Sequence, residues 1–168
     1  MKKISAFILL LAFVSATGMV CGQEKKSKKQ RQQEHAEQVQ KMIESQDYKF
    51  IAQRALPMSG RSVNLTFGYD VNISKDTISS HLPYFGRAYV APMNNTQAGI
   101  RFVSTDFEYQ LENAKKDGWN VNITPKDGQR RCRFTLRVFS NGSASLTVND
   151  DTRQSISFNG YITERQKK

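Results

Sequence analysis

From Asp47 onward, apolar and polar residues alternate along the chain, and this pattern limits the fold to half-buried β-strands. The segment 63–74, VNLTFGYDVNIS, is a clear example. It predicts one antiparallel strand with every second residue on the apolar face: Leu65, Phe67, Tyr69, Val71 and Ile73. Because the turns between such segments are short, an antiparallel sheet fits the pattern better than a parallel sheet with crossover helices.

Further alternating segments follow, separated by turns that contain Gly, Asn, Asp or Pro. Asn141-Gly142 is the strongest of these turn signals, because this pair favours a tight hairpin. We expect about eight or nine strands, at the spacing typical of all-β domains. Besides 63–74, the expected strand segments are 48–57, 77–82, 100–114, 119–125, 132–139, 145–149 and 154–163. The predicted fold class is all-β, an antiparallel barrel or a two-sheet sandwich, with an N-terminal helix.

The segment that begins at Ile100 cannot be one regular strand. Ile100 and Phe102 fall on one face of an extended chain, whereas Phe107 and Tyr109 fall on the other. A bulge or corner near residues 104–106 would let both pairs reach the same core.

Residues 1–22 have the features of a secretory signal peptide. Lys2 and Lys3 form a basic start, and the apolar stretch that follows is too short to span a bilayer as a normal helix. Cleavage after Gly22 would leave a mature chain with no transmembrane span. The expected location is therefore periplasmic or secreted.

A lipid anchor at Cys21 is the alternative. Lipoprotein signals place a large aliphatic residue three positions before the cysteine and a small residue directly before it, whereas this chain has Gly18 and Val20 there. The sequence thus favours soluble export over anchoring, and one acyl chain alone gives only marginal attachment to a membrane.

The segment 23–46 is charged and contains no Gly or Pro. Val39 and Ile43 recur at helical spacing in its second half, so we expect a helix that docks near its end. This helix is either a solvated spacer or a basic arm that binds a surface. The cations of such an arm are Lys25, Lys26, Lys28, Lys29 and Arg31. A β-rich domain is expected to cover 47–163, followed by a basic tail at 164–168.

The formal net charge of +10 is strongly basic. In an exported protein, such a charge suits envelope lipids, glycans or proteins that carry negative charge. The expected location excludes nucleic acid as a partner, despite the charge.

The sequence contains no motif that predicts catalysis, a cofactor or a metal site. His35 lies in the polar helix. His81 is next to Ser80, but neighbouring residues of a strand point to opposite faces, so the two do not form a catalytic pair. We therefore expect a protein that is not an enzyme.

The remaining reactive groups also favour structural interpretations. Cys132 shares a strand face with Phe134 and is expected to be buried and unreactive. Asp150 and Asp151 suit a hairpin turn better than a cation site, because Asp side chains bond readily to their own backbone in turns.

Basic residues cluster in the segment KDGQRRCR at 126–133. The structural interpretation is a charged strand edge, which discourages edge-to-edge pairing. The functional interpretation is an anion-binding patch formed by Lys126, Arg130 and Arg131.

The segment LPYFGRAY, residues 82–89, combines aromatic residues with a proline, a glycine and an arginine. Pro83 suits the end of a strand, and Gly86 permits a bend. The structural interpretation is a corner whose aromatic side chains plug one end of a barrel. The functional interpretation is an aromatic lip for a sugar or peptide, with four candidate binding residues: Tyr84, Phe85, Arg87 and Tyr89.

This octet resembles the hallmark of domain-of-unknown-function family 4251, which comprises exported proteins of Bacteroidetes. Four further segments agree, GIRFVSTDFEY, DGWNVNI, SNGSASLTV and RQSISFNGYI, so the resemblance covers roughly residues 45–163. It implies an envelope or secreted location and assigns no activity or catalytic residue. Asp76-Thr77-Ile78 also resembles the short O-glycosylation sequence of exported Bacteroidetes proteins, which makes Thr77 a candidate modification site.

These observations favour an exported, non-catalytic binding or structural module of the bacterial envelope. Its partner would be an envelope glycan, lipid or protein. The alternative function is a carrier of small apolar ligands inside a β-barrel. Such a carrier needs an open cavity, with lining residues such as Phe67, Tyr69, Trp119 and Phe134, so a packed interior would exclude it.

The position of the mature N-terminus is a testable consequence of the signal features. We expect it at Gln23, because Val20-Cys21-Gly22 fits the small-x-small cleavage rule. Mass spectrometry of the protein exported by its native host measures this directly. A diacylglyceryl group on Cys21 would instead establish the lipid anchor.

Overall fold

A computed structural model describes residues 27–89, 99–114, 118–127 and 132–165 of the chain. These residues form one helix and ten strands, which confirms the all-β prediction with an N-terminal helix. The elements are α2 (Lys28–Ser45), β1 (Tyr48–Pro57), β2 (Val63–Asn64), β3 (Asp70–Ile73), β4 (Ile78–Leu82), β5 (Ile100–Ser104), β6 (Phe107–Asn113), β7 (Gly118–Pro125), β8 (Cys132–Phe139), β9 (Ser143–Asp150) and β10 (Arg153–Glu164). Among the described residues, no helix has the length and apolar character needed to cross a bilayer.

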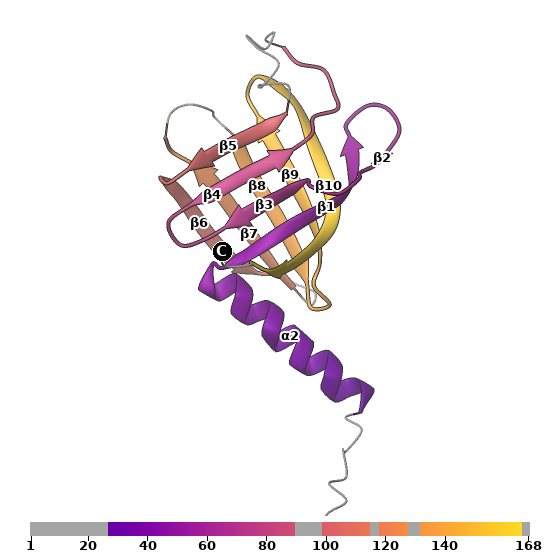
Figure 1. The fold of residues 1–168 in the computed structure, drawn as a ribbon, viewed down its shortest axis with the longest axis vertical. Helices are drawn as coiled ribbons and strands as arrows, with labels where there is room; N and C mark the ends of the chain where they lie inside the picture. The colour runs from indigo at the N-terminus through magenta and orange to yellow at the C-terminus, as the bar shows by residue number, and fades with distance from the viewer. Residues whose placement is uncertain (1–26, 90–98, 115–117, 128–131, 166–168) are drawn as a thin grey trace, which may run out of the picture.

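The strands form one antiparallel sheet that curls into a nearly closed barrel (Figure 1). Their order is β5-β4-β3-β1-β10-β9-β8-β7-β6, and the short β2 pairs with β1 beside this path. Of the two architectures that the sequence allows, the structure is therefore the barrel. The sheet has its two edges at β5 and β6, which follow one another directly in the chain.

The barrel is joined together where the first strand pairs with the last. The ladder between β1 and β10 runs from Tyr48 opposite Glu164 to Pro57 opposite Ile156, and its register shifts between Ala52 and Arg54. At Gly160 the two backbones approach so closely that a Cβ atom would collide with the carbonyl group of Ile51.

The predicted corner near residues 104–106 is confirmed. β5 ends at Ser104 and β6 begins at Phe107. Ser104 is buried, and its Oγ donates a hydrogen bond to the carbonyl oxygen of Asp106 at 2.9 Å. Ile100 of β5 is also buried, whereas in β6 the odd-numbered Phe107 and Tyr109 pack against the core, so the inward-facing parity changes across this corner.

The prediction of one continuous strand over 63–74 is wrong. The structure has β2 and β3 there, separated by a loop, and Phe67 is fully exposed. The cause is the irregularity of β1, which bonds to both ends of the loop: Leu65 N donates to Gln53 O at 2.8 Å, and Ala52 N donates to Tyr69 O at 2.9 Å. Residues 66–68, between these two anchors, are exposed.

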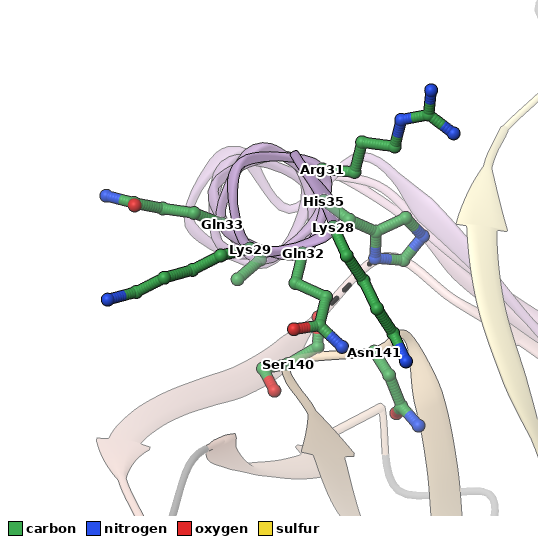
Figure 2. A pocket seen from close by; sticks show the side chains of 9 residues that line it. Lys28, Lys29, Arg31, Gln32, Gln33, His35, Ser140 and Asn141 are labelled. Atoms are coloured by element: carbon green, nitrogen blue, oxygen red, sulfur yellow. Dashed lines mark hydrogen bonds between the residues drawn. The ribbon is translucent and has the colours of Figure 1, made fainter. Parts of the chain in front are cut away.

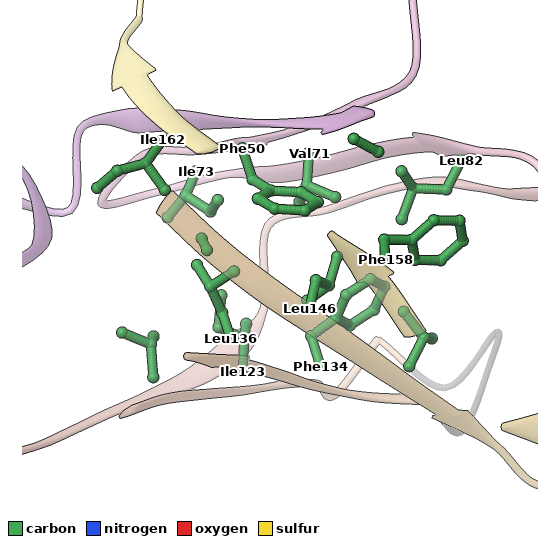
Figure 3. Packing of buried hydrophobic residues seen from close by; sticks show 14 of the residues in the cluster. Phe50, Val71, Ile73, Leu82, Ile123, Phe134, Leu136, Leu146, Phe158 and Ile162 are labelled. Atoms are coloured by element: carbon green, nitrogen blue, oxygen red, sulfur yellow. The ribbon is translucent and has the colours of Figure 1, made fainter. Parts of the chain in front are cut away.

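Apolar side chains fill the barrel interior (Figure 3). The largest of the fully buried side chains come from strands around the barrel: Tyr48, Phe50, Ile73, Leu82, Ile123, Phe134, Leu136 and Phe158. Cys132 is also buried and forms no disulfide, which confirms its predicted burial.

Helix α2 packs against one end of the barrel by its second half (Figure 1). Val39 and Ile43 are completely buried, whereas residues 28–35 are exposed. The helix begins with a capping box, in which Ser27 Oγ accepts from Gln30 N at 3.2 Å and Gln30 Oε1 accepts from Ser27 N at 2.9 Å. The expectation of a helix that docks near its end is confirmed.

Two tyrosine hydroxyls fasten the end of the helix to the sheet. Tyr109 Oη donates to the carbonyl oxygen of Ile43 at 3.0 Å and lies 3.2 Å from Tyr48 Oη. Because the carbonyl can only accept, Tyr109 uses its hydrogen there, and Tyr48 must donate to Tyr109. Burial raises the pKa of Tyr109 to about 12, and burial together with Tyr109 raises the pKa of Tyr48 well above its ordinary value.

These two hydroxyls should make the fold sensitive to alkali. A tyrosine whose pKa is higher in the folded state stabilises the fold fully below pH 10, and the contribution is lost as pH rises toward 12. Between pH 10 and 12, the free energy of unfolding of the wild-type protein should decrease with pH. In Tyr109→Phe this decrease should be smaller by about 1.4 kcal/mol per pH unit. Urea denaturation at a series of pH values measures it.

Tyr161→Phe, at an outward-facing position of β10, is the matched control. An equal change of slope in both variants would contradict the assignment to the buried pair.

Candidate functional site

The octet 82–89 leaves the end of β4 and runs beside the β9–β10 turn. Tyr89 N donates to Thr152 O at 2.8 Å, and Gln154 N donates to Arg87 O at 3.1 Å. A bend falls at Gly86, as the sequence predicts. Backbone hydrogen bonds therefore attach the octet to the barrel, independently of its side-chain contacts.

Tyr84 is held in place by contacts on several sides. Its Oη lies 2.9 Å from the carbonyl oxygen of Arg87 and 3.1 Å from that of Gln154, and donates to either. A Cβ atom at residue 86 would lie 2.8 Å from this hydroxyl, so Gly86 makes room for it. The guanidinium of Arg153 lies 4.8 Å from the ring centroid, in the geometry of a cation–π contact. Burial raises the pKa of Tyr84, against the opposing effect of the Arg153 charge.

Arg153 belongs to a buried ion pair in the β9–β10 turn. Its Nε lies 3.3 Å from Asp150 Oδ2, and the two side chains are only 9% and 3% exposed. Asp150 Oδ1 accepts from the backbone N and the Oγ1 of Thr152, at 2.9 and 2.6 Å. Asp150 thus has the turn role that the sequence favours, and removal of either charge would leave the other buried without its ion-pair partner.

The four candidate residues of the octet divide into two pairs. Tyr84 and Phe85 are half-buried and pack against the core, which matches the plug interpretation. Arg87 and Tyr89 are exposed, Tyr89 by 65%, and face solvent at the rim. The first pair therefore contributes to packing, while the second pair is accessible at the surface.

The other predicted site residues are not brought together with the octet. Lys126 Nζ lies 3.4 Å from a carboxylate oxygen of Glu108, while Arg130 and Arg131 lie outside the described residues. Thr77 closes the β3–β4 turn, where its backbone N and O both bond to Ser74. Within the described ranges, no group of three or more His, Cys, Asp or Glu side chains has the arrangement of a metal site.

The two histidines serve separate structural contacts. The His81 ring lies 5.7 Å from the Tyr69 ring, centroid to centroid. His35 Nδ1 lies 3.4 Å from the carbonyl oxygen of Ser140, at the β8–β9 turn. A Cβ atom at residue 142 would lie 3.2 Å from the His35 ring, so Gly142 allows the helix to approach this turn.

Sequence reasoning missed a groove between the exposed half of α2 and the β8–β9 turn, called the basic groove below (Figure 2). Its volume is about 910 Å³, and its lining includes Lys28, Lys29, Arg31, Gln32, His35 and Asn141. None of the nine lining residues carries a carboxylate. The cation cluster was visible in the sequence as a possible basic arm, but its position beside Asn141 was not.

The basic groove presents its cations in several directions. In Figure 2, Lys28 and Gln32 point toward the turn, Lys29 points to the opposite side of the helix, and Arg31 points away from both. This spread suits an extended anionic surface better than a single small anion, which would need converging donors.

The residues expected to line a ligand cavity inside the barrel do not line a common space. Phe134 is completely buried in the packed interior, whereas Phe67 is fully exposed in the loop between β2 and β3. Trp119 and Tyr69 are half-buried and pack against the core. Among the described residues, apolar side chains therefore occupy the interior that the carrier function would need open.

Comparisons with known proteins give a family and a fold. A family model described as "Domain of unknown function (DUF4251)" matches residues 30–162. The chain is also similar to the crystal structure of a DUF4251 family protein from Bacteroides eggerthii, with a TM-score of 0.57 and 10% sequence identity, over 77% of this chain and 87% of that one. At this identity the likeness supports the fold alone. No curated protein matches the chain.

The division of the octet can be tested by stability. We expect Tyr84→Ala and Phe85→Ala each to lower the free energy of unfolding by about 2–3 kcal/mol, because both rings are partly buried. Arg87→Ala should change it by no more than about 0.5 kcal/mol, since its side chain is exposed. Urea denaturation midpoints measure all three. If both aromatic variants keep the wild-type midpoint but lose binding to envelope glycans, the octet is a lip and not a plug.

Proposed function

This chain belongs to the DUF4251 family, and we propose that it is an exported, non-catalytic binding module of the bacterial envelope. The filled barrel interior is the observation that carries this proposal, because it leaves the outer surface as the place for a partner. On that surface, the basic groove has the charge that suits an anionic envelope component.

The contacts of the ionisable side chains support a role without catalysis. His81 contacts Tyr69, and His35 contacts the β8–β9 turn. Asp150 and Arg153 stabilise the β9–β10 turn. None of these four groups is a nucleophile beside a base in a cavity, which is what acyl or glycosyl transfer would require.

Export is supported by the signal features of residues 1–22. If cleavage occurs after Gly22, Cys132 is the remaining cysteine, and its buried thiol needs no disulfide partner in an oxidising compartment. The proposed location is periplasmic or secreted.

The partner that best fits the basic groove is a surface of phosphate-bearing lipids. Lys28, Lys29 and Arg31 point in different directions from one exposed helix, and the sequence adds Lys25 and Lys26 directly before it. Each basic side chain near such a surface contributes about 1 kcal/mol of attraction. The cluster is also the part of the helix that packs least against the barrel, so the barrel leaves it accessible.

Vesicle sedimentation tests this proposal. The mature protein from Gln23 should bind phosphatidylcholine vesicles that contain phosphatidylglycerol, and bind pure phosphatidylcholine vesicles much more weakly. Substitution of Lys28, Lys29 and Arg31 by Gln should weaken binding at least about tenfold.

The matched control removes the same charge elsewhere, by substitution of Arg61, Lys75 and Arg101 by Gln. These three side chains are exposed and lie outside the basic groove. Equal loss in both triple variants, or no binding by the wild-type protein, would overturn the proposal.

A further inference from the structure

We infer that a cleft on the outer wall of the barrel, called the aromatic cleft below, binds the ring of a neutral saccharide. The cleft lies over β1 and β10 and is bounded by the loop 65–69. Its volume is about 460 Å³, which falls in the range of small-molecule sites. The lining residues on which the inference rests are Lys49, Ile51, Phe67, Tyr69, Asp70 and Tyr161.

The loop of the aromatic cleft is fixed to the barrel at both ends. Leu65 N bonds to Gln53 O, and Tyr69 O accepts from Ala52 N, each at less than 3 Å. Gly68 has φ of +100°, a conformation that glycine adopts without strain, and nothing lies near the position of its missing Cβ atom. The loop is thus anchored but has open space beside its tip, where a ligand can enter.

Aromatic side chains give the aromatic cleft its apolar faces. Phe67 is fully exposed at the loop tip, and Tyr161 is 38% exposed on the outer face of β10. Tyr161 lies opposite Ile51 in the β1–β10 ladder, which adds an aliphatic surface between the two strands. Because Phe67 is fully exposed, its ring adds no buried contact to the fold. It is, however, the type of side chain against which the C–H face of a sugar ring stacks.

The polar end of the aromatic cleft determines the charge of the ligand. Lys49 Nζ lies 3.1 Å from Asp70 Oδ2, and Asn72 Nδ2 donates to Asp70 Oδ1 at 3.1 Å. The ion pair is partly exposed, with 30% and 23% of the two side chains accessible. Lysine keeps further donors and the carboxylate keeps further lone pairs. An anion would be repelled by Asp70 and a cation by Lys49, whereas a neutral hydroxyl can donate to the carboxylate and accept from the ammonium.

A peptide strand fits this position less well. β1 is already paired with β10 on one side and with β2 and β3 on the other, so its backbone has no free edge at the cleft. Recognition there depends on side chains alone, without the backbone hydrogen bonds that attach an added strand. An apolar face combined with neutral hydroxyl partners is instead the chemistry of a pyranose ring.

The aromatic cleft is separate from the basic groove. The loop between β2 and β3 lies on the wall of the barrel, while the exposed half of α2 projects beyond one end of the barrel (Figure 1). The two sites share no lining residue. A negative result in the sugar-binding test therefore does not contradict the proposal of lipid binding at the basic groove, and the reverse also holds.

An NMR titration of the ¹⁵N-labelled mature protein tests the inference. The probes are methyl glucoside, methyl mannoside, methyl galactoside and N-acetylglucosamine, each up to about 50 mM, the range in which millimolar affinities saturate. With at least one of them, we expect amide shifts confined to residues 49–53, 65–70 and 161. Phe67→Ala should weaken that binding about tenfold or more, and Phe67→Trp should restore it.

The controls separate this site from the rest of the surface. Phe67 is fully exposed, so its loss should leave the fold intact. Val103→Ala removes apolar surface from another exposed side chain, which lies on β5 outside the cleft, and should bind sugar like the wild-type protein, as should the triple Gln variant of Lys28, Lys29 and Arg31. Absence of shifts with all four sugars overturns the inference. So does shift of the same amides by the tripeptide Gly-Phe-Gly alone, or equal binding by Phe67→Ala.

Discussion

The pairing of β1 with β10 is the interaction on which the rest of the structure depends. It joins the first strand to the last across most of the chain, whereas the other ladders join strands that are consecutive in the chain or, for β1 and β3, separated by one short strand. Such a contact closes a long loop and is costly in chain entropy. It also demands a close backbone approach, since a Cβ atom at Gly160 would occupy the place of the Ile51 carbonyl. Without this pairing, the two halves of the sheet would have no common core.

Both proposed binding surfaces follow from the course of β1. The strand starts directly after α2, so its inward-facing Tyr48 reaches the hydroxyl of Tyr109 that fastens the end of the helix. Farther along β1, the irregularity near Gln53 divides the segment that pairs with this strand into β2 and β3. Phe67 lies in the loop between these two short strands and is exposed to solvent. One strand thus positions the basic groove through the helix and the aromatic cleft through the loop.

Local patterns predicted the elements well, and distant partners account for what they missed. The corner near 104–106 and the hairpin turns at Asn141 and Asp150 are determined by adjacent residues, and the sequence shows them. The position of Phe67 is different, because its alternation matches that of a buried strand and only the irregularity of β1 excludes it. In the same way, the contact of Tyr84 with Arg153 and the groove beside Asn141 depend on segments that are far apart in the chain.

The stability of the fold does not account for the positions of two groups of side chains. The first turn of α2 contains Lys28 and Lys29 and no acidic residue, although positive charge at this end opposes the helix dipole. Phe67 is fully exposed, although burial of such a ring would stabilise the fold by about 1.5–3 kcal/mol. Although the interior is filled and Tyr84 and Phe85 of the octet are packed, these two groups are surface features whose cost to the fold is not offset by contacts within it. Contact with a ligand or partner outside the barrel is the interaction that would offset that cost.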